Sequence, residues 1–275
     1  MAQTNKRVVV VAGGSSGLGL KIGEAFGGLH DAIVVLLARG QTQLDAAVDG
    51  LKATQEFDVL GMVVDATDES QVQQVVRDIV IQFGKIDVWV NAVGKSIRTD
   101  FKTTGIEKYR ELMEANFFAS VTCSLAAIPE LEKTSGSLVN IGSLASKTAW
   151  PLVAPYVTGK HALAGFCHQL RLEGPANVHF LHVCPGPIKR DGNEQRYSDQ
   201  AKSLPDSATK PGAGAPVKGI DPETLAKKIV IACERRVPEL MIPWKSRLLF
   251  SIQQLFPKLG DKLTRRLSKG TSSDS

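Results

Sequence analysis

The feature of this chain that most constrains its fold is the run RVVVVAG (7–13), which a glycine-rich turn follows at once. The run is β-branched and apolar, without the alternation of a half-exposed strand, which predicts a strand buried on both faces of a parallel sheet. Neighbouring parallel strands need a crossover between them, and the usual crossover is a helix. The run therefore predicts that strands and helices alternate along the chain.

The rest of the sequence has that alternation. The predicted strands are 7–13, 32–38, 59–65, 86–94, 136–143 and 177–186. The predicted helices are 18–28, 42–53, 68–84, 106–131 and 154–173. We expect the fourth helix to end at Pro129 and its neighbours, because proline interrupts helices. This order predicts a Rossmann-type, doubly wound α/β fold with a parallel sheet between two layers of helices.

Composition bounds the number of domains. The 275 residues are 43% hydrophobic and 22% charged, as in a soluble globular domain, and no long low-complexity linker divides them. The four cysteines lack CxxC or Cys/His spacing, which predicts neither a metal site nor a disulfide framework. The N-terminal apolar run is too short for a signal peptide or a membrane span. We expect a cytoplasmic protein with one Rossmann-fold domain at 1–242 and an extension at 243–275.

Residues 187–219 differ in character from the rest of the domain. They are polar and rich in glycine, proline and serine, with few large apolar side chains. Loops longer than about 12–15 residues are uncommon unless they are functional or disordered. This segment directly follows the sixth predicted strand, at the edge where ligands of such sheets bind. It is either a mobile substrate lid or a disordered insertion.

The turn AGGSSGLG (12–19) has the context of a dinucleotide-binding loop, because it follows a buried strand and opens a helix. Glycines let the backbone turn tightly and approach a pyrophosphate at a helix N-terminus. The predicted contacts in this loop are Gly13, Ser15, Ser16, Gly17, Leu18 and Gly19. The signal is weak by itself, since glycine-rich turns after strands are common.

Tyr156 and Lys160 end the stretch LASKTAWPLVAPYVTGK (144–160) and stand four residues apart. Such a pair can simply cover one face of a surface helix. Alternatively, the ammonium group lowers the pKa of the phenol from its usual value of about 10 and makes it a usable acid or base near neutral pH. The neighbouring motifs decide between these interpretations.

Several other elements accompany this pair in a fixed order. They are the glycine-rich turn, VNAVG (90–94), Asn116 in MEANFFAS, Ser143 in NIGSLAS and CPGPI (184–188). Together they resemble the short-chain dehydrogenase/reductase family, over roughly residues 6–190. One Tyr-x3-Lys is frequent by chance, whereas the ordered set is highly specific. The resemblance implies an enzyme that interconverts a carbonyl and a secondary alcohol with a nicotinamide cofactor.

The resemblance also implies a role for each catalytic residue. Tyr156 would be the acid/base, and Lys160 would tune it and bind the nicotinamide ribose. Ser143 would hydrogen-bond the substrate oxygen, and Asn116 would hold a water that links Lys160 to solvent. Taken singly, Ser143 is as well explained as a helix N-cap, Asn116 as a turn residue and Lys160 as part of a solvated face. Their joint presence favours the catalytic roles and argues against a non-catalytic cofactor sensor of the same fold. A third alternative, a membrane-associated scaffold, rests only on the basic C-terminal segment.

The end of the second predicted strand indicates the cofactor. NAD-preferring folds normally carry an acidic residue there, which binds the ribose hydroxyls. This strand ends LLARG, so Arg39 follows and no carboxylate would repel a 2′-phosphate. Arg39 can meet that phosphate through a planar, charge-assisted fork, with Ser15 as a second contact. We therefore expect NADP(H) in preference to NAD(H); the alternative is that Arg39 is an ordinary surface cation.

Further cofactor contacts follow from the resemblance. They are Asp65, Ala66, Asn91, Ala92, Pro185, Gly186 and Ile188. The sequence departs from the family pattern where Ala12 replaces a threonine and where Ala92 replaces an asparagine that braces the sheet. In addition, Arg190 stands where a threonine commonly clamps the carboxamide, and the backbone of Ile188 can serve instead.

The segment 243–270 is both basic and apolar. It combines Trp244, Leu248, Leu249, Phe250, Ile252, Leu255, Phe256 and Leu259 with Lys245, Arg247, Lys258, Lys262, Arg265, Arg266 and Lys269. The net charge of +5 is therefore concentrated here, without the aromatic-basic interleaving of single-strand binders, and we expect no nucleic-acid partner. The segment predicts either peripheral contact with a membrane that carries anionic headgroups or a helix packed on a partner subunit.

Our expectations for the substrate class and the oligomeric state rest only on the family resemblance. The stretch 143–160 and the C-terminal extension are most similar to the 11β-hydroxysteroid dehydrogenase branch, whose members act on lipophilic ketones and alcohols. That similarity implies an apolar carbonyl or alcohol substrate. It also suggests a homodimer or homotetramer joined through the helices at 106–131 and 154–173. The physiological substrate and the preferred direction of reaction are not encoded in any motif.

Overall fold

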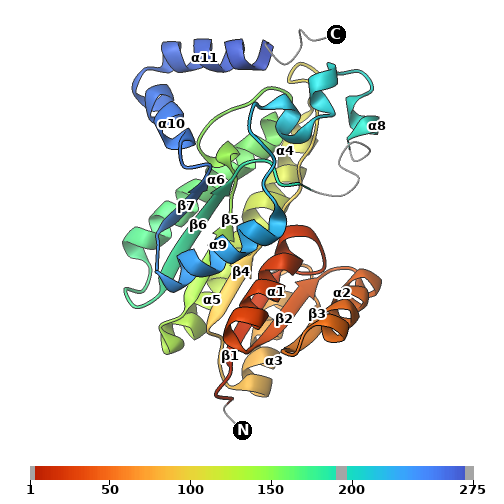
Figure 1. Cartoon of the computed structure of the whole chain (residues 1–275), viewed down its shortest axis with the longest axis vertical. Coiled ribbons are helices and arrows are strands. Elements are labelled where there is room, and N and C mark those ends of the chain that lie inside the picture. The colour runs from red at the N-terminus through yellow and green to blue at the C-terminus, as the bar shows by residue number, and fades with distance from the viewer. Residues whose placement is uncertain (1–3, 190–196, 270–275) are drawn as a thin grey trace.

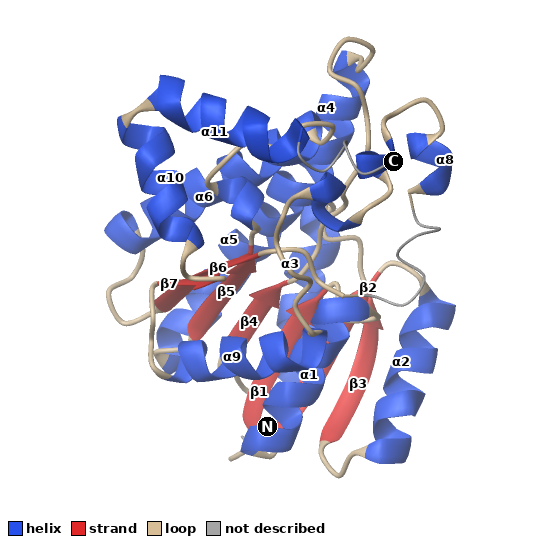
Figure 2. Cartoon of the chain, turned by 45° about the horizontal axis from the view of Figure 1, so that its top comes forward, coloured by secondary structure: helices blue, strands red, loops and turns tan. Residues whose placement is uncertain are grey.

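The computed structural model describes residues 4–189 and 197–269 of the chain (Figure 1). A seven-stranded sheet, parallel throughout, lies between two layers of helices (Figure 2). The strands are β1 (Arg7–Ala12), β2 (Ala32–Ala38), β3 (Asp58–Val63), β4 (Val88–Asn91), β5 (Ser137–Ile141), β6 (His179–Pro185) and β7 (Glu239–Ile242). Their order across the sheet is β3-β2-β1-β4-β5-β6-β7. The predicted α/β/α fold is confirmed.

The helices divide into two layers and a C-terminal pair. They are α1 (Gly17–His30), α2 (Gln41–Thr54), α3 (Glu69–Phe83), α4 (Ile106–Met113), α5 (Ala119–Thr134), α6 (Ala154–Glu173), α9 (Pro222–Glu234), α10 (Ser246–Leu255) and α11 (Pro257–Lys269). The apolar sides of α1, α2 and α9 share one hydrophobic core with the sheet. Those of α3 and α5 share the other core, on the opposite face.

These two cores explain the unbroken apolar run of β1. Side chains alternate between the faces of a strand, so Val9 and Val11 enter one core while Val8 and Val10 enter the other. All four are fully buried. A central strand covered by helices on both faces has no polar face, which is why its sequence does not alternate.

The predicted fourth helix differs from the expectation in two ways. It is interrupted by a π-helical turn (η1, Glu114–Phe118), and Pro129 lies inside α5, which continues to Thr134. The prediction that the helix ends at Pro129 is therefore wrong. The N–H that proline lacks would have bonded the carbonyl of Leu125, a residue whose side chain is exposed, so the loss falls on the solvent side of the helix.

The stretch Ile106–Thr134 is also long and apolar enough to cross a membrane, by length and composition alone. Here it packs against β4, β5, α3 and α6. Helix α9 and strand β7 were not predicted from the sequence. Strand β7 pairs with β6 at the edge of the sheet, and its carboxyl end leads into α10.

The described part of the segment after β6 contains short helical elements. Within its described part, 197–219, lie α8 (Ser198–Ala201) and two 3-10 turns, η3 (Asp206–Ala208) and η4 (Pro211–Gly214). A parallel bridge joins Ile188 to Ile220 at the two ends of the segment. Arg190, at the departure from the family pattern, lies outside the described residues.

Candidate active site

A cavity of about 1350 Å³ opens at the carboxyl edge of the sheet. Its floor is built from residues at the ends of the first six strands, and its upper wall includes residues of α10 and α11. Sites for drug-sized ligands typically measure about 300–1,000 Å³, so this cavity has room for more than one small molecule. With one exception, Asn91, every residue predicted for the site lines it.

Asn91 faces away from the cavity. Its side chain is fully buried, and its Nδ2 donates to Asn140 Oδ1 and Ser124 Oγ, each at 2.9 Å. Its Oδ1 accepts a 2.8 Å hydrogen bond from Trp89 Nε1. The prediction that Asn91 contacts a cofactor is therefore wrong for the side chain, which instead braces β4 against β5 and α5. It supplies the sheet-bracing amide that Ala92 cannot.

The glycine-rich loop is shaped by positions where no side chain fits. Gly13 has φ +81°, and a Cβ on it would lie 2.9 Å from the carbonyl carbon of Ala92. A Cβ on Gly19 would lie 2.1 Å from the oxygen of Gly13. Gly17, at φ +55°, has no neighbour within 4 Å of its Cβ position and faces the cavity.

The helix that follows this loop leaves its first N–H groups available. Ser16 is the N-cap of α1, and its side chain makes no capping hydrogen bond. Uncapped N–H groups and the helix dipole favour an anion at this point. The loop can therefore hold the pyrophosphate of a dinucleotide against the end of α1.

Arg39 stands exposed just after β2, at the rim of the same cavity. Ser15 lies on the loop beside it, with its Oγ 3.5 Å from Oε1 of Gln43. Gln43, on α2, also lines the cavity and was missed from the sequence, where nothing distinguishes it from other helix-surface residues. Next to them, Asp65 accepts hydrogen bonds from the N–H and the hydroxyl of Thr67. This corner therefore gathers a guanidinium, a hydroxyl and a carboxylate at one end of the cavity.

Ser143 follows β5 and is a helix N-cap, one of the two roles that the sequence left open. Its Oγ accepts a 3.1 Å hydrogen bond from the N–H of Ala145 and caps the 3-10 turn η2 (Leu144–Ser146). The hydroxyl of Ser146 returns a bond to the N–H of Ser143. Ser143 also lines the cavity and is hydrogen-bonded to Tyr156. The cap therefore fixes the serine where it meets the phenol.

The pKa of Tyr156 is raised from its ordinary value, mainly because the phenol is buried. The hydrogen bond with Ser143 and the positive charge of Arg98 act in the opposite direction but do not overcome burial. The prediction that Lys160 makes this phenol more acidic is wrong for this structure. The phenol therefore stays protonated at neutral pH.

Lys160 is buried, with 3% of its surface exposed, so it does not belong to a solvated helix face. Its Nζ donates a 2.8 Å hydrogen bond to the carbonyl oxygen of Ile141. Burial lowers its pKa from 10.5 to about 8. The ammonium group also lies beside Gly94, where an added Cβ would come within 3.3 Å of Nζ and 2.8 Å of Asn116 Oδ1.

Asn116 belongs to the π-helical turn η1 and not to a loop turn. Its Oδ1 accepts from the N–H of Lys95 at 3.1 Å, and its Nδ2 donates to the carbonyl oxygens of Lys95 and Leu112 at 2.9 Å. The side chain is fully buried. Single π-turns occur frequently at functional sites, and this one directs Asn116 toward the loop that carries Gly94 and away from the outer surface.

Arg98 is a cavity residue that the sequence analysis missed. It is 5% exposed, and its Nε donates to the carbonyl oxygen of Ala208 at 2.8 Å. Its guanidinium stacks on the ring of Tyr197, 3.9 Å from the centroid. These contacts join the loop after β4 to the segment after β6 directly above the site. No local sequence pattern marks such a residue, because Tyr197 and Ala208 lie 99 and 110 positions away from it in the chain.

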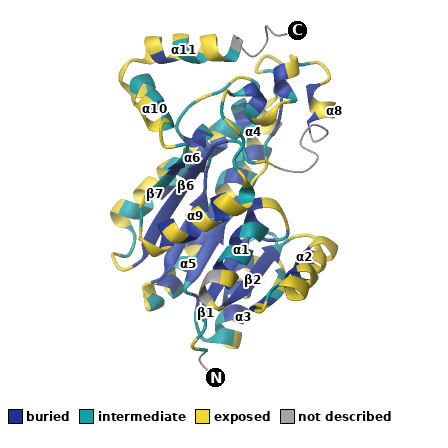
Figure 3. Ribbon diagram, in the orientation of Figure 1, coloured by how far each residue is buried: buried dark blue, intermediate teal, exposed yellow. Residues whose placement is uncertain are grey.

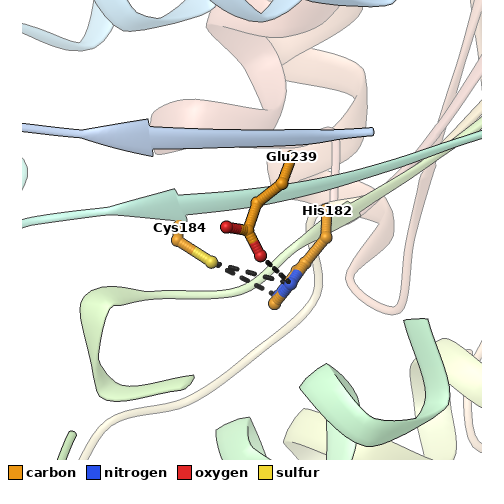
Figure 4. A group of neighbouring side chains, drawn as sticks. All are labelled: His182, Cys184 and Glu239. Atoms are coloured by element: carbon orange, nitrogen blue, oxygen red, sulfur yellow. Dashed lines mark hydrogen bonds and ion pairs between the residues drawn. The ribbon is translucent and has the colours of Figure 1, made fainter. Parts of the chain in front are cut away.

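One group of potential metal ligands occurs among the described residues. His182, Cys184 and Glu239 place an imidazole nitrogen, a sulfur and a carboxylate oxygen within 4.8 Å of one another (Figure 4). Lys147, however, forms a 2.6 Å ion pair with Glu239, and Arg247 approaches it at 3.5 Å. Burial raises the pKa of the Cys184 thiol to about 12, which opposes the thiolate that a metal requires. The group ties β6 and β7 to the loop after η2.

Comparisons with known proteins bear on the family and the fold of this chain. The family model described as short chain dehydrogenase matches residues 7–201. A Dictyostelium discoideum protein named dehydrogenase/reductase SDR family protein 7-like is 28% identical over 271 residues, which are 96% of this chain and 83% of that one. The 11-beta-hydroxysteroid dehydrogenase 1A of Arabidopsis thaliana is 27% identical over 192 residues, covering 70% and 55% of the two chains. A solved structure of L-sorbose reductase from Gluconobacter frateurii, complexed with NADPH and L-sorbose, matches with a TM-score of 0.74 at 26% identity, over 87% of this chain and 95% of that one.

Proposed function

Because this chain belongs to the short-chain dehydrogenase family, we propose that it is an NADP(H)-dependent oxidoreductase that interconverts a carbonyl and a secondary alcohol. The observation that carries the proposal is that Ser143, Tyr156, Lys160 and Asn116 line one cavity together with the glycine-rich loop. The bound cofactor would supply or accept the hydride. Everything else the reaction needs must come from the chain itself.

The protonation of Tyr156 supports the reductive direction. Reduction of a carbonyl needs a proton donor for the alkoxide that develops on the substrate oxygen. A phenol whose pKa is raised by burial is protonated at neutral pH and can donate. The Ser143 hydroxyl, hydrogen-bonded to the same phenol, can bind the substrate oxygen from its other side.

Lys160 would bind the cofactor beside Tyr156 and Ser143. One of its N–H groups is committed to the oxygen of Ile141, which fixes the position of the ammonium. The remaining N–H groups can bind the hydroxyls of a nicotinamide ribose. Asn116, held on the backbone of Lys95, would hold a water between Lys160 and solvent, and so return the proton that Tyr156 gives up.

The preference for NADP(H) rests on Arg39 and Ser15 at the rim. The L-sorbose reductase of similar fold is described as complexed with NADPH, which supports the same choice here. A charge-assisted hydrogen bond contributes about 1.5–3 kcal/mol, so Arg39→Ala should raise the Kd for NADPH by roughly 10- to 150-fold. The Kd for NADH should change by less than about threefold, and Lys52→Ala, on the nearby helix α2, serves as a control that leaves both unchanged. Equal effects of Arg39→Ala on the two cofactors would contradict the phosphate contact.

An apolar substrate is favoured by the wall of the cavity beyond Tyr156. Leu144, Trp150, Val153, Leu249 and Phe250 contribute to it. The test is NADPH oxidation by the purified chain across a panel of ketones that ranges from large and apolar to small and charged. We expect turnover to rise with apolar surface. Turnover confined to small, strongly charged carbonyl compounds would refute the apolar site, and no turnover with any member would count against the enzyme itself.

The assembly expected for a cytoplasmic enzyme of this kind is a homodimer or homotetramer. Exposed apolar side chains, including Phe118, Leu125 and Leu172, lie along the helices at 106–134 and 154–173. Their burial against a second copy would remove apolar surface from water. Light scattering after size exclusion would give the mass directly, and a monomer at micromolar concentration would contradict this assembly.

A further inference from the structure

The net positive charge of the chain comes from its C-terminal segment, 243–269. Residues 243–269 hold seven lysines and arginines against one acidic residue, Asp261, for a net charge of +6. The whole chain carries +5, so the remainder carries −1. Fields of this kind draw a protein toward anionic partners. The fold places this charge on α10 and α11 and just before them, and the two helices lie together at one end of the molecule (Figures 1 and 2).

The same helices expose large apolar side chains. We define the apolar ridge as Trp244, Leu248, Leu255, Phe256 and Leu259. Leu248 and Leu255 are 71% and 72% exposed and stand seven residues apart, so they share one face of α10. Trp244 is 72% exposed. Figure 3 shows exposed residues along both helices. A ridge of this size is costly to leave in water and is typical of an interaction surface.

We propose that α10 and α11 dock the protein on an anionic lipid bilayer, with the apolar ridge in the interface and the cations among the headgroups. Exposed Lys258, Lys262, Arg265 and Arg266 alternate with the leucines of α11, as in helices that lie in the plane of a membrane. Each basic side chain near such a surface adds to the attraction. A bilayer satisfies both the apolar ridge and the charge.

Other occupants fit less well. A second copy of this chain would bring another +6 against the first, and like charges at a shared interface oppose association. Nucleic acid would meet the cations but would leave the apolar ridge in water. The charge and the ridge together therefore favour the bilayer.

The cavity reaches these helices. Leu249 and Phe250 of α10 line it together with Thr264 and Leu267 of α11, so the docking helices also form part of its wall. Resting on the proposed function, this means that an apolar substrate dissolved in the bilayer reaches Tyr156 without crossing bulk water. Docking and access are separate steps, and the experiment measures docking without turnover.

The test is co-sedimentation of the full chain with vesicles of phosphatidylcholine, alone or with about 30% phosphatidylserine. We expect binding to the anionic vesicles that falls with added salt and is at least about tenfold weaker with Lys262→Glu plus Arg266→Glu. The matched control is Lys227→Glu plus Lys228→Glu, the same charge change on exposed residues of α9, which should weaken binding less than threefold. Leu248→Ser plus Leu255→Ser should weaken binding to both vesicle types.

Three results would overturn the proposal. The first is no binding to anionic vesicles, and the second is an equal loss in the α9 control. The third is a dimer that Leu248→Ser plus Leu255→Ser converts to monomer, because this would assign the apolar ridge to a second copy. Because NADPH binding and ketone turnover are measured without vesicles, failure of the proposed enzyme activity and failure of docking are told apart.

Discussion

Lys160→Met tests how much the buried ammonium group of Lys160 destabilises the folded protein. Burial lowers the pKa of Lys160 from 10.5 to about 8, while the unfolded chain keeps the ordinary value. Between these two values the unfolded state binds more protons than the folded state, so stability rises with pH in that window. The folded protein thus carries a penalty below about pH 8 that fades as the pH rises toward 10.5.

The size of the penalty follows from the shift. At about 1.4 kcal/mol per pKa unit, the difference between 10.5 and about 8 corresponds to roughly 3 kcal/mol. Methionine removes the charge but also the hydrogen bond to the oxygen of Ile141, which is worth about 1–2 kcal/mol. We expect Lys160→Met to be more stable than wild type at pH 7 by about 1–2 kcal/mol, or by about 3–6 °C in Tm.

The assay is urea unfolding of both proteins, followed by circular dichroism, at pH 7.0 and pH 9.5. The advantage of Lys160→Met should shrink by about 2 kcal/mol between the two values, because wild-type Lys160 loses its proton over that range. Lys227→Met, an exposed lysine on α9, is the control and should show no such change. A Lys160→Met protein whose difference from wild type is the same at both pH values would refute the account of this buried ammonium.

Two further predictions concern residues whose roles only the fold reveals. Arg98→Met removes the positive charge that lowers the pKa of Tyr156, so the alkaline limb of the pH profile of kcat/KM should move to higher pH. Arg98→Lys keeps the charge and should leave that limb in place. Identical profiles for wild type and both variants would exclude the electrostatic role of Arg98. Asn91→Ala removes the buried hydrogen-bond partner of Asn140 Oδ1 and of Trp89 Nε1, and it should destabilise the fold by about 2–4 kcal/mol. The Kd for NADPH should stay within about threefold of wild type. A large loss of NADPH affinity in protein that is still folded would restore Asn91 to the cofactor site.

The central architecture could be predicted because its signals are local. Strands buried on both faces have unbroken apolar runs, as β1 and β2 do, and the helix predicted at 154–173 has the observed bounds. The carboxyl ends of parallel strands meet at one edge of a sheet. Residues from distant motifs, such as Gly13 and Ser143, could therefore be expected in one cavity.

Side-chain direction was harder to predict. Trp89 and Asn91 stand two residues apart on β4, so they share one face of the sheet, and Trp89 lies in the core beneath α3 and α5. That alternation could have placed Asn91 in the core, but the family motif drew it into the predicted site. Helix α9 also carried a readable signal, since Asp221 caps it and Pro222 occupies its first turn.

Other features depend on contacts that no local pattern encodes. Strand β7 has only four residues and exists because it pairs with β6. The contacts of Arg98 with Tyr197 and Ala208 join residues that lie far apart in the sequence. The raised pKa of Tyr156 results from burial by the surrounding fold, whereas the sequence shows only a lysine four positions away.

The central claim is that Tyr156 gives its proton to a substrate held beside a bound nicotinamide. Its most direct test measures NADPH affinity by fluorescence and ketone turnover in wild type and in Tyr156→Phe. The account predicts a Kd within about threefold of wild type and a fall in kcat of at least about 10²–10⁴-fold, the range that general acid catalysis contributes. Turnover in Tyr156→Phe equal to that of wild type would contradict it.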